Sequence, residues 1–180
     1  KIASIKDCIV AERKIDPQLL ALNSQGYLNG HTPFTAMLSF LGVFCAALFD
    51  YKNVVFSNEK SADEGNAEYL GTAINHQYAK SSDFENKFKT YCKKYLAPKI
   101  RYSSFLRKYT EADISKSFSR YPQYFSVFSS CNVGLKTGER WCGDCPKCLF
   151  VYATLYPYLS EKQLRKTFGK DIFRNKSLLP

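Results

Sequence analysis

Four of the seven cysteines of this 180-residue chain lie within one short stretch, SCNVGLKTGERWCGDCPKCLF, which runs from Ser130 to Phe150. The last three cysteines of the stretch are each separated by two residues, and the first lies ten residues further upstream. Four thiolates at such spacings suit a tetrahedral zinc ion, because a C-x2-C turn supplies neighbouring ligands and more distant chain supplies the others. We therefore expect a structural zinc site made by Cys131, Cys142, Cys145 and Cys148.

Two other kinds of cysteine site use similar spacings. Iron–sulfur clusters also take cysteines two residues apart, but their fourth ligand commonly lies three residues downstream, whereas Cys131 lies upstream. Redox-active thiols are the third alternative. A zinc ion with four protein ligands has no open position for a catalytic water, so we expect the metal to connect loops and to take no direct part in chemistry.

A long apolar segment, Phe34 to Phe49, predicts a buried helix. It is shorter than the roughly 20 residues that a membrane span needs. Thr32 and Pro33 are typical of the N-cap and of the first residue of such a helix. The loop before it carries Asn29, His31 and Thr32 at a helix N-terminus, where free N–H groups favour an anion.

Helices and short apolar strands alternate along the chain. The segments NVVFS (Asn53 to Ser57) and KIRYSSF (Lys99 to Phe105) predict parallel strands, and the polar loop NEKSADEGN follows the first of them. This alternation predicts an α/β fold with a parallel sheet, in which ligands bind at the carboxyl ends of the strands. The other predicted elements are a helix from Ser82 to about Leu96 with a Ser82–Glu85 capping box, helices over residues 110–121, 146–159 and 160–169, and a strand or extended run over residues 124–130.

The net charge of +10 is unevenly distributed. Between Lys80 and Lys108 there are nine Lys or Arg residues and only two acidic residues, Asp83 and Glu85. Such a stripe suits a nucleic acid or a nucleotide, and a solvated helix face is the alternative. Four aromatic residues recur in the stripe at helical spacing, so we expect them in the core and not on a base-stacking surface. They are Phe84, Phe88, Tyr91 and Tyr95.

Three cysteines lie outside the cluster, namely Cys8, Cys45 and Cys92. Their odd number and irregular spacing favour packed thiols in a reducing cytoplasm over a disulfide framework. We expect no secretory signal, because no charged segment leads into a short apolar run with a small-residue cleavage site. Because the chain begins at Lys1 and stops on NKSLLP, we also expect it to be a piece of a longer protein.

The segment YTEADISKSFSRYPQYFSVFSSCNVG, together with CGDCPKC, resembles the end of the N-type ATP pyrophosphatases, particularly the 7-cyano-7-deazaguanine synthase group. Three further stretches, LNGHTPFTA, SNEKSADEGN and NHQYAKSSDFE, occur in the same order as in a family of that superfamily, the UDP-N-acetylmuramoyl-L-alanyl-L-glutamate epimerases. The resemblance runs from about Asp16 to the end. It implies an adenine-nucleotide hydrolase-like (HUP or Rossmann-like) parallel-sheet fold with a C-terminal four-cysteine zinc knuckle.

The resemblance also implies a division of the chain. Residues 1–130 would be a partial ATP-pyrophosphatase-like α/β domain, and residues 131–180 a zinc knuckle with a helical segment packed on it. The Gly-rich SGGxDS-type loop of the superfamily, which holds ATP phosphates, does not occur in the sequence. We therefore expect a C-terminal fragment that is inactive alone, and a homologue without ATP chemistry is the alternative.

The reaction implied by the resemblance converts the terminal L-Glu of UDP-MurNAc-L-Ala-L-Glu to D-Glu in peptidoglycan precursor synthesis. It is an isomerisation through an acyl-adenylate, with ATP and Mg as co-substrates and with AMP and pyrophosphate as products. The expected partner is the UDP-muramoyl dipeptide, and no nucleic acid is expected to bind. The protein is expected in the cytoplasm, without a membrane span. The alternatives are a related pyrophosphatase acting on a deazapurine or a tRNA base, and a non-catalytic nucleotide-binding module.

Such a reaction needs groups for proton transfer and for phosphates. His76 is the candidate acid or base because histidine titrates near neutral pH, and a hydrogen-bonded loop histidine is the alternative. Glu59, beside Asn58, is a candidate ligand for Mg or a ribose hydroxyl, or a solvated loop residue. His31 is expected to orient its loop or contact nucleotide, unless it only caps a helix. The other candidate substrate- or nucleotide-binding residues are Asn29, Thr32, Asn58, Lys60, Ser61, Asn66, Asn75, Lys80, Arg107 and Lys108.

Overall fold

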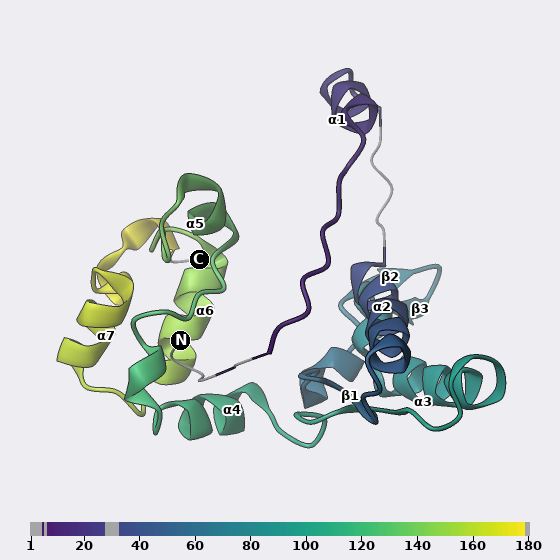
Figure 1. Cartoon of the computed structure of the whole chain (residues 1–180). Coiled ribbons are helices and arrows are strands. Elements are labelled where there is room, and N and C mark those ends of the chain that lie inside the picture. Colours follow the sequence, from purple (N-terminus) through teal and green to yellow (C-terminus); the bar gives the residue numbers. More distant parts are fainter. Residues whose placement is uncertain (1–4, 6, 28–32, 179–180) are drawn as a thin grey trace. The chain divides into compact units, whose positions relative to one another are not determined.

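The computed structural model describes residues 5, 7–27 and 33–178, which form two compact units (Figure 1). The N-terminal unit ends at Arg107, and the C-terminal unit begins at Lys108. The sequence placed the domain boundary between residues 130 and 131, and its assignment of the two parts to domains stays a prediction. The predicted site residues Asn29, His31 and Thr32 lie outside the described residues.

The N-terminal unit combines helices with two small sheets. Its helices are α1 (Pro17–Ser24), α2 (Phe34–Leu48) and α3 (Ser82–Tyr91), with short helical turns η1 (Lys60–Asp63), η2 (Tyr78–Lys80) and η3 (Cys92–Leu96). Its strands are β1 (Asn53–Phe56), β2 (Ala67–Tyr69), β3 (Thr72–Ile74) and β4 (Arg101–Ser104).

Strands β1 and β4 pair in parallel, with Val54 opposite Tyr102 and Phe56 opposite Ser104. The two predicted strands, their parallel pairing and the mixed α/β class are therefore confirmed. Strands β2 and β3 form an antiparallel hairpin that the sequence did not predict. The nucleotide-hydrolase-like fold stays a prediction.

The core of this unit lies between the β1–β4 pair and helices α2 and α3, which Figure 1 shows beside β1. Ser39 on α2 and Tyr102 on β4 meet in this core through a hydrogen bond of 2.8 Å between their hydroxyls. Because each hydroxyl satisfies the other, neither costs the core an unpaired polar group. The buried apolar residues are Val43, Ala46, Val54, Phe88, Cys92 and Tyr102.

Helix α2 confirms the predicted helix but corrects two details. It begins at Phe34, one residue later than predicted, and Pro33 is its N-cap without a side-chain hydrogen bond. Only one face is buried, because Phe44 and Leu48 are each 63% exposed. Among the described residues, no helix has both the length and the apolar character that would let it cross a bilayer.

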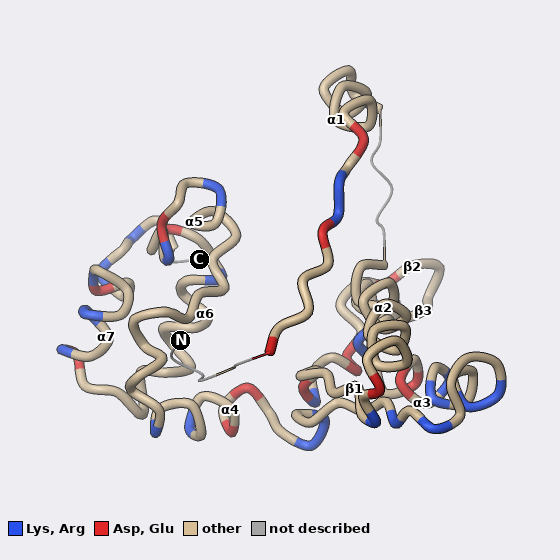
Figure 2. Tube along the Cα trace, viewed as in Figure 1, with Lys and Arg blue, Asp and Glu red and all other residues tan. Residues whose placement is uncertain are grey.

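The N-cap of helix α3 lies one residue before the predicted one. The hydroxyl of Ser81, not of Ser82, accepts a hydrogen bond from Phe84 N at 3.1 Å. This register turns Glu85 inward, so the predicted Ser82–Glu85 capping box is wrong. Figure 2 shows Lys and Arg along α3 and the turns after it, as the charge distribution predicts.

The aromatic residues of this basic stripe divide into two groups. Phe88 is buried, and its ring contacts those of Phe84 and Tyr102. Tyr91 and Tyr95 are exposed, so the prediction that all four stripe aromatics lie in the core is wrong for these two. Of the three cysteines outside the cluster, Cys92 is buried and Cys45 is half-buried, but Cys8 is exposed and therefore not the packed thiol that was predicted.

The C-terminal unit is helical. Its elements are α4 (Glu111–Phe118), η4 (Pro122–Tyr124), α5 (Asn132–Thr137), α6 (Pro146–Leu155), α7 (Glu161–Phe168), η5 (Ile172–Arg174) and η6 (Lys176–Leu178). Their core surrounds Tyr152 and Leu155 of α6 and Leu164 and Phe168 of α7.

Local signals at both ends of α7 predicted its boundaries correctly. Ser160 and Gln163 form a capping box at its start, and Gly169 ends it with a φ of 79°. No strand forms over residues 124–130, where a strand or extended run was predicted: Tyr124 ends η4, residues 125–127 form a turn, and residues 128–130 have no regular secondary structure. Helix α6 ends at Leu155 and not at Leu159, since turns occupy the residues that follow.

Candidate functional site

The four clustered cysteines converge in the C-terminal unit, with all four Sγ atoms within 4.8 Å of one another. The Sγ atoms of Cys131 and Cys145 lie 3.8 Å apart, as do those of Cys142 and Cys148. Zinc–sulfur bonds of about 2.3 Å in a tetrahedron separate the sulfur atoms by about 3.8 Å. The arrangement therefore fits a four-thiolate metal site.

Backbone N–H groups surround these sulfurs. Gly134 N donates to Cys131 Sγ at 3.1 Å, and Cys142 N donates to the same sulfur at 3.5 Å. Gly143 N donates to Cys148 Sγ at 3.4 Å. Such donors stabilise the charge of thiolates, which are the form of cysteine that binds a metal.

The same contacts change the acidity of the thiols. Burial opposes ionisation of Cys131, but the hydrogen bonds from Cys142 N and Gly134 N outweigh it and lower its pKa to about 6. Burial and the neighbouring thiols raise the pKa of Cys148. Four sulfurs this close do not all ionise without a cation, so the site is suited to a divalent metal ion.

Three local features bring the cysteines together. Cys131 is the N-cap of α5, and Gly134 in the first turn leaves room for the chain that returns at Glu139 and Arg140. Cys145 is the N-cap of α6, where Pro146 occupies the first helical position. That helix carries Cys148 into the buried side of the cluster.

The turn between Cys142 and Cys145 is tied to the chain after α7. Lys170 Nζ contacts both carboxylate oxygens of Asp144, at 2.9 and 2.8 Å. Asn175 Nδ2 donates to Asp144 Oδ1 at 2.6 Å and to Gly143 O at 3.3 Å. The cysteine turn thus holds the C-terminal segment of its unit in place.

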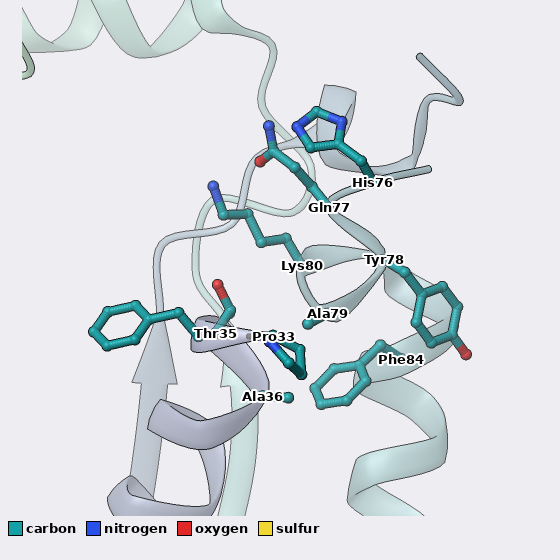
Figure 3. A pocket seen from close by; sticks show the side chains of 10 residues that line it. Pro33, Thr35, Ala36, His76, Gln77, Tyr78, Ala79, Lys80 and Phe84 are labelled. Carbon is teal, nitrogen blue, oxygen red and sulfur yellow. The ribbon is translucent and has the colours of Figure 1, made fainter. Parts of the chain in front are cut away.

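The N-terminal unit contains a pocket of about 540 Å³. Its walls are the start of α2, from Pro33 to Ala36, and the segment from His76 to Lys80, with Phe84 beside them (Figure 3). The Lys80 ammonium group forms no ion pair with the acidic residues that the structure describes. The pocket therefore offers an imidazole and an ammonium group beside a helix N-terminus.

Polar side chains also gather at the carboxyl ends of β1 and β4. Asn58 follows β1 and is buried, and Ser104 ends β4 with a buried hydroxyl that finds no partner among the described residues. Arg107 Nη1 donates to Glu59 O at 3.2 Å, which joins the segments that follow the two strands. The predicted gathering of polar groups at this edge is what parallel strands produce.

Hydrogen bonds connect the loop after β1 with the segment that carries His76. Asn66 Oδ1 accepts from His76 N at 3.0 Å. Asn75 Nδ2 donates to Ala62 O at 2.7 Å, and Asn75 Oδ1 accepts from Gln77 N at 2.8 Å. Both asparagines therefore fix the backbone around His76.

Comparison with known proteins gives two family matches. The MurL N-terminal domain matches residues 2–105, and the MurL C-terminal domain matches residues 127–180. The chain belongs to the MurL family. The two matches cover most of each unit of the MurL chain, including the His76 pocket and the four cysteines.

Three curated relatives carry the name UDP-N-acetyl-alpha-D-muramoyl-L-alanyl-L-glutamate epimerase. The chain is 37% identical to that of Salinispora tropica over 99% of its own length and 40% of the relative. It is 40% identical to that of Xanthomonas oryzae pv. oryzae over 89% of its own length and 37% of the relative. It is 36% identical to that of a Micromonospora species over 96% of its own length and 39% of the relative. The chain thus spans about two fifths of the length of these MurL proteins. No solved structure matches it.

The structure brings together several of the predicted site residues of this MurL chain. His76 and Lys80 line one pocket, and Arg107 links the backbones of Glu59 and Lys80. Asn66 and Asn75 hold the His76 segment by their side chains. Ser61 is half-buried in η1, Lys60 is exposed beside it, and Lys108 is exposed in the C-terminal unit. Their roles in binding stay predictions.

The sequence reasoning missed two buried polar residues beside the candidate site. Glu85 was interpreted as a cap, although it lies one residue after Phe84 and three before Phe88, on the buried side of α3. Ser104 was placed only within a strand. Each of these two residues is polar and lies on the apolar face of its helix or strand. Because buried polar groups require partners, this position could have predicted that each residue contacts other polar groups.

Proposed function

We propose that this chain is part of an ATP-dependent epimerase that converts the terminal L-Glu of UDP-MurNAc-L-Ala-L-Glu to D-Glu. The observation that carries the proposal is the 36–40% identity, over nearly the whole chain, to proteins named for this epimerase. The activity belongs to a protein of the relatives' full length. The 180 residues supply part of the site and are inactive alone.

The proton on the α-carbon of the terminal glutamate is only weakly acidic. A carboxylate makes the neighbouring α-proton hard to remove, because deprotonation adds a second negative charge beside the first. Joining the carboxylate to AMP removes that charge and releases pyrophosphate, so an enolate-like state becomes accessible. The proton then returns to the opposite face, and hydrolysis releases AMP and the D-Glu product.

His76 is the acid or base of this scheme. Its imidazole lies at the pocket that also contains Lys80 (Figure 3). Its backbone N–H donates to Asn66 Oδ1. Lys80 provides a positive charge for a phosphate or for the developing oxyanion. Glu59, at the carboxyl end of β1, binds Mg or a ribose hydroxyl. Together these residues supply proton transfer and charge stabilisation within one unit.

Zinc is the metal that we assign to the four cysteines. The sulfur spacing and the N–H donors described above support it, and four thiolates leave no open coordination position for a reacting water. The ion would hold α5, α6 and the cysteine turn together. We place the enzyme in the reducing cytoplasm, because the number and spacing of its cysteines favour free thiols and a metal site over a disulfide framework.

One observation favours a second function, binding of a tRNA or deazapurine substrate. The exposed rings of Tyr91 and Tyr95 lie 5.2 Å apart, next to Lys93 and Lys94. Exposed aromatic and basic residues suit stacking on bases. A steep loss of RNA affinity with added salt would support this function over the epimerase.

The proposed function is tested with ATP, Mg and UDP-MurNAc-L-Ala-L-Glu, in a protein of the relatives' full length that carries this chain. Pyrophosphate release and the chirality of the glutamate are measured in the same reaction. D-Glu formed together with pyrophosphate supports the epimerase. Pyrophosphate released only with a deazapurine or RNA substrate supports the second function.

A further inference from the structure

Arg107 connects four segments of the N-terminal unit. Its Nη2 donates to Lys80 O at 2.7 Å, and its Nη1 donates to Glu59 O at 3.2 Å. Its Nε and Nη2 both donate to Glu85 Oε2, at 3.2 and 3.0 Å. A second, longer ion pair joins Arg107 Nη1 to Asp63 Oδ1 at 4.0 Å. One side chain thus fixes the loop after β1, turn η2 and helix α3 relative to the end of β4.

This role requires a guanidinium group. Arginine presents five N–H donors in a rigid plane, whereas lysine presents three donors on one flexible atom. The Arg107 side chain is 18% exposed, so little water competes for these donors. Lysine at the same place would keep the charge beside Glu85 but would not span the two carbonyl groups.

Glu85 holds the guanidinium in this orientation. Its side chain is 8% exposed, and its other oxygen accepts from Lys89 Nζ at 2.6 Å and from Ser104 N at 3.3 Å. Burial alone would raise the pKa of the Glu85 carboxyl, but the hydrogen bonds from Lys89 and Arg107 outweigh it and lower the pKa. Glu85 therefore stays ionised at neutral pH and anchors Arg107 to α3.

The two carbonyls that Arg107 holds belong to residues at the site. Glu59 is the N-cap of η1 in the polar loop after β1, and Lys80 lines the pocket that contains His76. We propose that Arg107 is a positioning residue that sets the separation of these two walls of the site, and that it makes no contact with substrate. The proposal rests on the proposed function, because it assigns Glu59, His76 and Lys80 to that reaction.

The test compares Arg107→Lys with Lys89→Met in a protein of the relatives' full length that carries this chain. Lys89→Met is the matched control because Lys89 binds the same carboxylate but contacts neither loop. We expect Arg107→Lys to lower kcat for D-Glu formation about 100-fold with little change in KM, since small displacements of reacting groups have effects of this size. Lys89→Met should keep kcat within about threefold of wild type.

The effect of added guanidinium ion on kcat provides a second test. If Arg107 had only a structural role, the added ion would not change kcat. It should restore part of kcat in Arg107→Ala and should not raise kcat in Lys89→Met. Wild-type kcat in Arg107→Lys would overturn the proposal, as would equal losses in Arg107→Lys and Lys89→Met.

If the wild-type protein forms no D-Glu, the proposed function fails, and amide hydrogen exchange then decides the positioning role. Arg107→Lys should speed exchange over residues 58–64 and 76–81 by about tenfold relative to Lys89→Met. Unchanged exchange in both segments would overturn the role of Arg107, independently of the reaction.

Discussion

The carboxylate of Glu85 and the guanidinium of Arg107 form an ion pair of 3.0 Å inside the N-terminal unit, 22 residues apart in the chain. Both side chains are largely removed from water, and Lys89 completes the partners of the carboxylate. A buried ion pair is strongly destabilised when one partner is removed, because the remaining charge stays buried without compensation. The pair is therefore a point at which stability and site geometry are linked.

Replacing Glu85 with Gln should lower the free energy of unfolding at pH 7 by about 3 kcal/mol, because Arg107 loses its counter-charge. Since the pKa of Glu85 is lowered from 4.5 in the folded state, its stabilising effect is present above pH 4.5 and disappears as the pH falls below it. The difference in the free energy of unfolding between wild type and Glu85→Gln should therefore shrink as the pH falls. Urea unfolding followed at pH 7 and at pH 3.5 measures this difference, and an equal difference at both values would contradict the assignment.

Cys145→Ser should remove bound zinc and unfold the C-terminal unit, because metal binding and folding are coupled in such sites. Cys8→Ser is the control, since Cys8 is an exposed thiol outside the cluster. Zinc content after dialysis and circular dichroism would be measured for both variants. A Cys145→Ser protein that stays folded with one zinc ion per chain would show that the metal assignment is wrong.

Gly134→Ala should destabilise the C-terminal unit, although Gly to Ala in a helix usually adds about 1 kcal/mol of stability. A Cβ at this position would overlap Glu139 O and would lie 3.1 Å from Arg140 O, and backbone atoms cannot move away as a flexible side chain can. The change would also displace the N–H group that donates to Cys131 Sγ. Thermal unfolding of the zinc-loaded protein measures the effect, and a raised melting temperature would refute the close packing around α5.

His76→Gln should leave pyrophosphate release in place but reduce D-Glu formation about 100-fold or more, since general acid–base catalysis contributes at least this factor. The substitution keeps a polar side chain at the pocket, and Asn66 still accepts from the backbone N–H of residue 76. Both products would be measured in a protein of the relatives' full length. Inversion at the wild-type rate would remove His76 from the reaction.

Short-range signals in the sequence predicted much of this structure. The spacing of Cys142, Cys145 and Cys148 anticipated their convergence with Cys131, because a C-x2-C turn brings neighbouring thiols together. The apolar runs that became β1 and β4 predicted parallel strands, and the polar loop after β1 lies at the edge where ligands bind such sheets.

Long-range contacts were beyond the same reasoning. Arg107 was predicted to bind substrate or nucleotide, which stays a prediction, and its guanidinium holds the carbonyls of Glu59 and Lys80, which lie 48 and 27 residues away. No local pattern encodes such a contact. A shift of one residue at the start of α3 was enough to turn Glu85 from an expected cap into a core partner of Arg107.

The most direct test of the epimerase assignment is the configuration of the product glutamate. A protein of the relatives' full length that carries this chain would be incubated with ATP, Mg and UDP-MurNAc-L-Ala-L-Glu in deuterated water. We predict D-Glu with deuterium at its α-carbon, formed with one pyrophosphate and one AMP per inversion. Glutamate that stays entirely L and free of deuterium, while ATP is consumed or left intact, would contradict the assignment.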